Sequence, residues 1–235
     1  MVERRIEINA GPETIVSGIL SQPEDCRPGV TPALILAHGA SNDMTEPLLA
    51  AVAQRLGDSG SAGVLRFNFP FTERGAERPD KNPVLEQAFI RAHDTLRDDE
   101  LCRPGPVFLG GKSLGARIAA ELVSRGPEGE GLTAAGLVFL GFPLHSPGRK
   151  DKAHWEPLRR VNVPSLFVTG TKDAFCDLEI LAHVIAGLER PGELYLVEGG
   201  DHSLKVPKSD PRPQEVVYAA VGDKVAQFIN EVYRG

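Results

Sequence analysis

Residues 111–115 of the chain read G-K-S-L-G and combine a reactive side chain with the residues needed to present it. They follow an apolar run typical of a strand and open a segment with helical spacing. A serine at such a sharp turn has its hydroxyl lifted out of the sheet, at a helix N-terminus whose amides can hold negative charge. Gly111 and Gly115 remove side chains that would collide where strand and helix pass closest. The pattern therefore predicts a nucleophile elbow with Ser113 as the nucleophile.

A serine hydroxyl is a poor nucleophile at neutral pH and needs a base that a third group holds in place. Asp173 follows the apolar run 165–168, and His202 follows the run 193–197. Enzymes with this elbow place the partners in the order serine, acid, histidine, and the chain keeps that order. We expect His202 to be the general base and acid, and Asp173 to orient its imidazole.

Two other acids compete with Asp173 for this role. Asp177 lies four residues further on, and Asp201 adjoins the histidine. Asp201 would need an awkward geometry to orient its own neighbour. The order and the position at a strand end favour Asp173.

Two backbone amides must hold the oxyanion of the tetrahedral intermediate. The first is expected to be the N–H of Leu114, the residue after the nucleophile. The second is expected from the turn after an earlier apolar run, with Ala40 as the donor. Gly39 lets that backbone bend towards the site, and His38 is expected to be a structural hydrogen-bonding residue.

Three further polar residues accompany these segments. Lys112 either lines the site or is an exposed cation at the turn. Arg117 lies one helical turn after Ser113 and is placed to tie its helix to a neighbouring loop. His145, in the segment after the next strand, either lines the pocket or has a structural role.

Two other motifs have simpler explanations. Gly111-Lys112-Ser113 matches the end of a phosphate-binding Walker A loop, but Pro106 stands where that motif requires glycine, and apolar residues occupy the loop itself. Residues 57–61 read G-D-S-G-S, as around the serine of trypsin-like proteases. They occur too early in the chain, so a helix-ending turn is the better interpretation.

Composition limits the class of protein. A chain of 235 residues with 41% hydrophobic residues can bury a substantial core, and a net charge of −6 argues against nucleic acid as the main partner. No segment has the apolar length to span a membrane, and no secretory signal is visible at the N-terminus. Cys26, Cys102 and Cys176 are scattered and odd in number, which predicts reduced structural thiols in a cytoplasmic protein and no metal site.

Short apolar runs alternate with amphipathic segments along nearly the whole chain. This alternation predicts an α/β fold with a mainly parallel sheet covered by helices on both faces. The expected strands are 4–9, 13–20, 33–37, 64–69, 107–109, 136–140, 165–168 and 193–197, and the expected helices are 47–56, 82–98, 116–123, 176–188 and 215–233. Asn82 is expected to cap the second helix, with Pro83 at its first position. Residues 71–81, 143–154 and 205–214 are irregular but too short for a cap domain, so loops alone should cover the site.

Taken together, these segments resemble the α/β-hydrolase superfamily over essentially the full length. The resemblance is closest to the small, capless group related to dienelactone hydrolases, which includes NSL-complex-subunit and testis-expressed hydrolase-like proteins. The matching segments are 36–40, 66–70, 110–117, 140–145, 169–173 and 200–202.

The resemblance implies one α/β-hydrolase domain over residues 1–235, a sheet of about eight strands, no cap domain and no cofactor or metal. Ser113 stands where true dienelactone hydrolases have a cysteine, so their lactone substrate is not carried over. Ser41 replaces a glycine expected after His-Gly-Ala, in the oxyanion turn.

The leading hypothesis is a serine hydrolase that acts on a small acyl compound such as an ester through an acyl-enzyme. The alternative is a non-catalytic protein-interaction module with a vestigial site, since some members of the group resemble scaffold subunits. Acyl transfer to another acceptor and peptidase activity remain open. The sequence predicts neither the substrate nor the oligomeric state.

Overall fold

The computed structural model describes residues 1–100, 103–153, 155–190 and 192–234. Cys102, which we expected to be a structural thiol, and His154, the last residue of the irregular segment 143–154, lie outside the described residues. The strands are β1 (Val2–Gly11), β2 (Thr14–Gln22), β3 (Ala33–Ala37), β4 (Gly63–Phe67), β5 (Val107–Lys112), β6 (Leu137–Leu140), β7 (Ser165–Gly170) and β8 (Glu193–Val197). The α-helices are α1 (Pro47–Asp58), α2 (Pro70–Glu73), α3 (Asn82–Asp98), α4 (Leu114–Arg125), α5 (Leu178–Ala186) and α6 (Gln214–Arg234).

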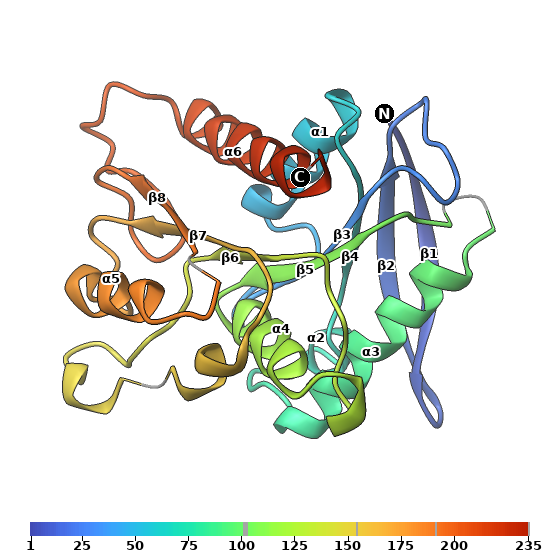
Figure 1. Ribbon diagram of the computed structural model, residues 1–235, viewed down its shortest axis with the longest axis horizontal. Coiled ribbons are helices and arrows are strands. Elements are labelled where there is room, and N and C mark those ends of the chain that lie inside the picture. The colour runs from blue at the N-terminus through green and yellow to red at the C-terminus, as the bar shows by residue number, and fades with distance from the viewer. Residues whose placement is uncertain (101–102, 154, 191, 235) are drawn as a thin grey trace.

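The strands form one eight-stranded sheet in the order β1-β2-β4-β3-β5-β6-β7-β8 (Figure 1). β1 pairs antiparallel with β2, and β2 pairs antiparallel with β4. All the remaining pairs are parallel. The carboxyl ends of β3, β5, β6, β7 and β8 therefore lie at the same edge of the sheet. The mainly parallel α/β sheet predicted from the alternating segments is confirmed.

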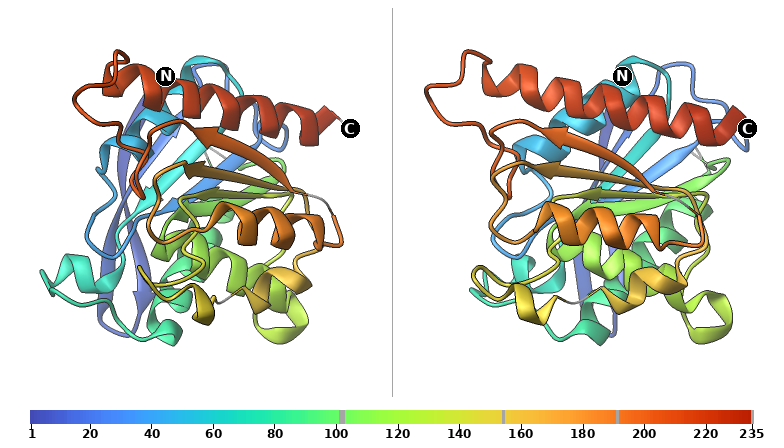
Figure 2. Two further views of the ribbon diagram at one scale, coloured as in Figure 1. Left: turned by 90° about the vertical axis from the view of Figure 1, so that its left-hand side faces the viewer. Right: turned by 60° about the vertical axis from the view of Figure 1, so that its left-hand side comes forward.

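Helices cover both faces of the sheet. α1 and α6 lie side by side on one face, and α3, α4 and α5 lie on the other (Figure 2). Successive residues of a strand point to opposite faces. Ile35 of β3 accordingly packs into the core under α3 and α4, whereas its neighbours Leu34 and Leu36 pack under α1 and α6. Strands buried on both faces explain why the sequence shows continuous apolar runs.

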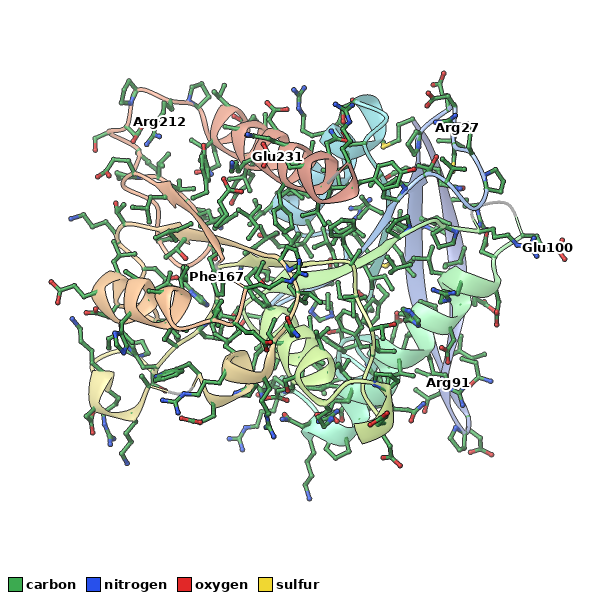
Figure 3. The ribbon with its side chains drawn as sticks, viewed as in Figure 1. Arg27, Arg91, Glu100, Phe167, Arg212 and Glu231 are labelled. Atoms are coloured by element: carbon green, nitrogen blue, oxygen red, sulfur yellow. The ribbon has the colours of Figure 1, made fainter. Side chains whose placement is uncertain are left out.

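The interior is filled by apolar side chains, both aliphatic and aromatic, and most charged side chains lie at the periphery (Figure 3). Phe167 of β7 is fully buried, and its ring centroid lies 4.8 Å from that of Phe139 of β6. Arg27, Arg91 and Glu100 are exposed (Figure 3). A rigid core of this kind gives the loops at the strand ends a fixed base.

The N-caps of α3 and α1 are residues that the sequence did not predict. α3 begins at Asn82 itself, so Lys81 is the N-cap and the predicted cap at Asn82 is wrong. The Asn82 amide instead donates to Glu121 at 2.9 Å and accepts from Arg117 at 3.1 Å, which ties α4 to the start of α3. α1 is capped by Glu46, whose carboxylate accepts the N–H of Leu49 at 3.1 Å.

The irregular segments carry little structure of their own. Residues 71–81 contain the end of α2, and a short 3-10 helix at Lys150–Lys152 lies in 143–153.

Among the described residues, no helix combines the length and apolar character that crossing a membrane requires.

Candidate active site

Three side chains from separate strand ends meet in one chain of hydrogen bonds. His202 Nε2 lies 2.8 Å from Ser113 Oγ, and His202 Nδ1 lies 2.9 Å from both carboxylate oxygens of Asp173. Because an ionised carboxylate only accepts, Nδ1 carries the proton and the Nε2 lone pair faces the serine hydroxyl. This is the arrangement in which an imidazole can remove a proton from a serine.

The backbone at Ser113 is strained in a way that presents its hydroxyl. Ser113 has φ of +51°, in the left-handed region that non-glycine residues rarely adopt. A Cβ at Gly115 would lie 2.3 Å from the carbonyl oxygen of Ala37, and one at Gly111 would lie 2.5 Å from the same atom. Strand β3 therefore passes so close to the elbow that only glycine fits at both positions.

A compact turn holds His202 in place. The Asp201 carboxylate accepts the backbone N–H groups of Ser203 at 2.7 Å and Lys205 at 2.9 Å. The Asp201 N–H donates to the Lys205 carbonyl at 2.9 Å, which closes the turn around the imidazole. Asp201, a rival acid in the sequence, thus shapes the loop of His202.

The other rival acid is also engaged elsewhere. The Asp177 carboxylate caps α5 by accepting the N–H groups of Glu179 and Ile180, and it pairs with Lys150. Asp173, by contrast, has a fully buried side chain facing His202.

Phe175 touches both partners of the serine, and the sequence analysis missed it. Its ring stacks on the His202 imidazole, and its N–H donates to Asp173 Oδ1 at 2.8 Å. The signal available in the sequence was that Phe175 lies two residues after Asp173. An aromatic residue at such a position is equally typical of core packing.

His145 braces the segment that carries Asp173. Its ring Nε2 accepts the Asp177 N–H at 3.1 Å, and its backbone N–H donates to the Phe175 carbonyl at 3.1 Å. The side chain is buried. Of the two roles left open for His145, these contacts favour the structural one.

The turn after β3 lies against the elbow, as expected for an oxyanion site. A Cβ at Gly39 would lie 3.5 Å from Ser113 Cβ. His38 Nε2 accepts the Phe69 N–H at 3.0 Å, so Nδ1 carries the proton and donates to the Gly39 carbonyl at 2.8 Å. In a trans peptide the C=O and N–H point in opposite directions, so the Ala40 N–H points away from the His38 ring. Leu114 is the first residue of α4, where the backbone N–H has no partner within the helix.

Lys112 is not the exposed surface cation that the sequence left open. Only 4% of its surface is exposed, and its Nζ donates to Asn42 Oδ1 at 3.2 Å. Burial lowers the pKa of Lys112 below its usual value, and the carboxylates of Glu46 and Asp201 oppose that shift. The Lys112 amine therefore lies beneath the turn at Gly39, 3.6 Å from where a Cβ of residue 39 would be.

Three other features of the described chain were candidates for a functional site: metal-ligating side chains, a cavity and a buried cysteine. No cluster of three His, Cys, Asp or Glu side chains suited to a metal ion occurs among residues 1–100, 103–153, 155–190 and 192–234. A cavity of about 630 Å³ between α1 and α6 is lined by residues that include Ala51, Arg55 and Tyr218, and none of its lining residues belongs to the hydrogen-bonded trio. Burial raises the pKa of the Cys176 thiol to about 12, which makes it an inert core residue.

Comparison with known proteins identifies the family. A family model described as an alpha/beta hydrolase domain matches residues 30–230, and the chain belongs to this family. The resemblance found in the sequence is thereby confirmed.

Solved structures share the fold over nearly their whole length. Dienelactone hydrolase from Anabaena variabilis is 20% identical with a TM-score of 0.71, covering 98% of this chain and 97% of that one. Est1E from Butyrivibrio proteoclasticus with bound ferulic acid is 16% identical with a TM-score of 0.73, covering 96% and 99%. XC6422 from Xanthomonas campestris, described as an α/β serine hydrolase without lid, is 18% identical with a TM-score of 0.66, covering 99% and 94%.

Proposed function

We propose that this protein is a serine hydrolase that cleaves a small ester or related acyl substrate through an acyl-enzyme. The observation that carries the proposal is the hydrogen-bonded series from Ser113 Oγ through His202 to Asp173. Membership of the alpha/beta hydrolase family supports hydrolysis as the reaction class, and the elbow strain supports Ser113 as the reacting residue.

In the acylation step, Ser113 Oγ attacks the substrate carbonyl carbon while its proton passes to His202 Nε2. The carbonyl electrons move onto oxygen, and the N–H groups of Leu114 and Ala40 bind this oxyanion. When the intermediate collapses, the bond to the leaving alcohol breaks, and the alcohol takes the proton from Nε2. Asp173 stabilises the imidazolium that exists between these two events.

Deacylation repeats the same steps with water as the nucleophile. Water gives a proton to His202 Nε2 as its oxygen attacks the acyl carbon, and collapse of the second intermediate releases the acid. Ser113 Oγ then recovers the proton from the imidazolium. The cycle uses no metal or organic cofactor.

The test is labelling with a fluorophosphonate probe, which reacts with an activated serine. Wild-type protein is expected to be labelled, and Ser113→Ala is expected to be unlabelled with an unchanged fold by circular dichroism. A panel of p-nitrophenyl esters of increasing acyl length then measures turnover and acyl size. No labelling of the wild type, or equal labelling of both proteins, contradicts the proposal and supports the non-catalytic interaction module instead.

A further inference from the structure

Lys112 is a buried cation without an ion pair in the part of the chain that the structure describes. Its hydrogen-bond partner is the neutral amide of Asn42, and no described carboxylate oxygen lies within 4.0 Å of its Nζ. Buried charges in proteins are normally paired, because removing them from water is unfavourable. An ammonium has three N–H donors, so this one retains capacity to interact with negative charge.

The position of the ammonium connects it with the reaction centre. A Cβ built on Gly39 would lie 3.6 Å from Lys112 Nζ, 3.5 Å from Ser113 Cβ and 3.3 Å from Asn42 Oδ1. The cation, its amide partner and the elbow thus surround one side of Gly39. The peptide that follows Gly39 carries the Ala40 N–H, which we propose as an oxyanion donor.

Charged groups around Lys112 come from several elements. Glu46 at the start of α1, Asp173 after β7, and Asp201 and Lys205 after β8 all act on it. The Glu46 carboxylate is buried, which raises its pKa, and it is used to cap α1. Asp201 and Asp173 are committed to the histidine turn and to the imidazole. None of these described carboxylates is within 4.0 Å of Nζ, so Lys112 forms no ion pair with them.

We propose that Lys112 assists the hydrolase reaction electrostatically: its ammonium, oriented by Asn42, stabilises the oxyanion held by the Ala40 and Leu114 amides. The substrate carbonyl is neutral and the tetrahedral intermediate is charged, so a fixed cation nearby favours the transition state over bound substrate. The cation transfers no proton and forms no bond. This inference rests on the proposed function.

The test compares two substitutions that remove the net charge in different ways. Lys112→Met removes the ammonium while keeping a long apolar side chain. Asn42→Asp keeps the ammonium but places a carboxylate 3.2 Å away, which neutralises it with an ion pair. Arg91→Met removes a charge from an exposed position of α3, outside the loops around the site, and serves as the control.

Both substitutions are expected to lower kcat by about tenfold or more while KM changes by less than about threefold, since they act on the charged intermediate alone. The rate of fluorophosphonate labelling should fall in parallel. The melting temperature should stay unchanged or rise in both variants, because Lys112→Met removes the unpaired buried charge and Asn42→Asp provides it with a partner. The control should retain wild-type kinetics.

The outcomes separate the two proposals. Full activity of Asn42→Asp, or of Lys112→Met, overturns the inference while leaving the hydrolase proposal intact. A lower melting temperature for Lys112→Met with wild-type kinetics for Asn42→Asp assigns Lys112 a purely structural role and also overturns it. A wild type that neither labels nor turns over esters overturns both.

Discussion

The ring of Phe175 lies against the imidazole of His202, with centroids 4.3 Å apart and planes inclined by 30°. The same residue donates its backbone N–H to Asp173, so it restrains the imidazole from its face and the carboxylate from its side. An imidazole held in this way has little freedom to rotate out of line with Ser113.

Replacing Phe175 by leucine should lower kcat/KM roughly three- to tenfold, because an aromatic contact of this kind contributes about 0.5–1.5 kcal/mol. The backbone hydrogen bond to Asp173 stays in place, so the fold should be unaffected. Phe175→Tyr keeps the stacked ring and should retain most of the activity. Equal kcat/KM values for the leucine variant and the wild type with a p-nitrophenyl ester would show that the stack does not matter.

The strained backbone of Ser113 should be measurable as lost stability. A left-handed non-glycine residue costs about 1–3 kcal/mol, and glycine adopts this conformation without that cost. Ser113→Gly should therefore have a higher free energy of unfolding in urea than Ser113→Ala, by about 1 kcal/mol after the entropy of glycine is included. If the alanine variant is as stable as the glycine variant, the turn is not strained.

The close approach of β3 to the elbow predicts a strong effect at Gly115. Gly115→Ala should reduce the free energy of unfolding by about 2 kcal/mol or more, because its Cβ would meet backbone atoms that cannot move aside. Gly187→Ala is the matched control, since a Cβ there meets atoms at 3.5 Å or more, which is ordinary contact. Urea unfolding of the two variants should separate them clearly; a similar loss in both would contradict the packing described here.

Stability should fall in mild acid because two imidazoles are buried. Burial lowers the pKa of His38 and of His93 below the 6.5 that is usual for an imidazole. The unfolded chain then binds protons more readily than the folded one, so this stabilisation is complete above pH 6.5 and is lost as the pH falls through the lowered pKa values.

Each histidine can contribute a slope of up to about 1.4 kcal/mol per pH unit. His93→Gln should reduce the slope of unfolding free energy against pH, and His183→Gln, at an exposed position, should leave it unchanged. A pH-independent wild type between pH 7 and 5 would be inconsistent with buried neutral imidazoles.

The sequence predicted the features that depend on local pattern. The fully apolar run at 33–37 coincides with β3, whose residues are all buried, because such a stretch suits a buried strand in this alternation. The run at 193–197 coincides with β8, although most of its residues are only half-buried. Ser113, Asp173 and His202 were expected to converge because each follows a strand, and the distances agree with that expectation. Their catalytic roles, and those of Ala40 and Leu114, remain predictions.

What the sequence did not predict depends on partners far along the chain. Asn82 has the residue type of a helix cap, but it bonds instead with Glu121, 39 positions later. Lys112 stands at a turn where cations are usually solvated, but it is buried, and the turn at residues 39–42 packs against its ammonium. No pattern within a short segment records such contacts.

The peptide linking Gly39 to Ala40 has its carbonyl fastened on the inner side by an imidazole that no solvent reaches. The direction of the Ala40 N–H at the surface is therefore fixed by the buried His38 imidazole. Substitution of His38 is therefore expected to change the direction of the Ala40 N–H, the proposed oxyanion donor, without altering any solvent-exposed side chain.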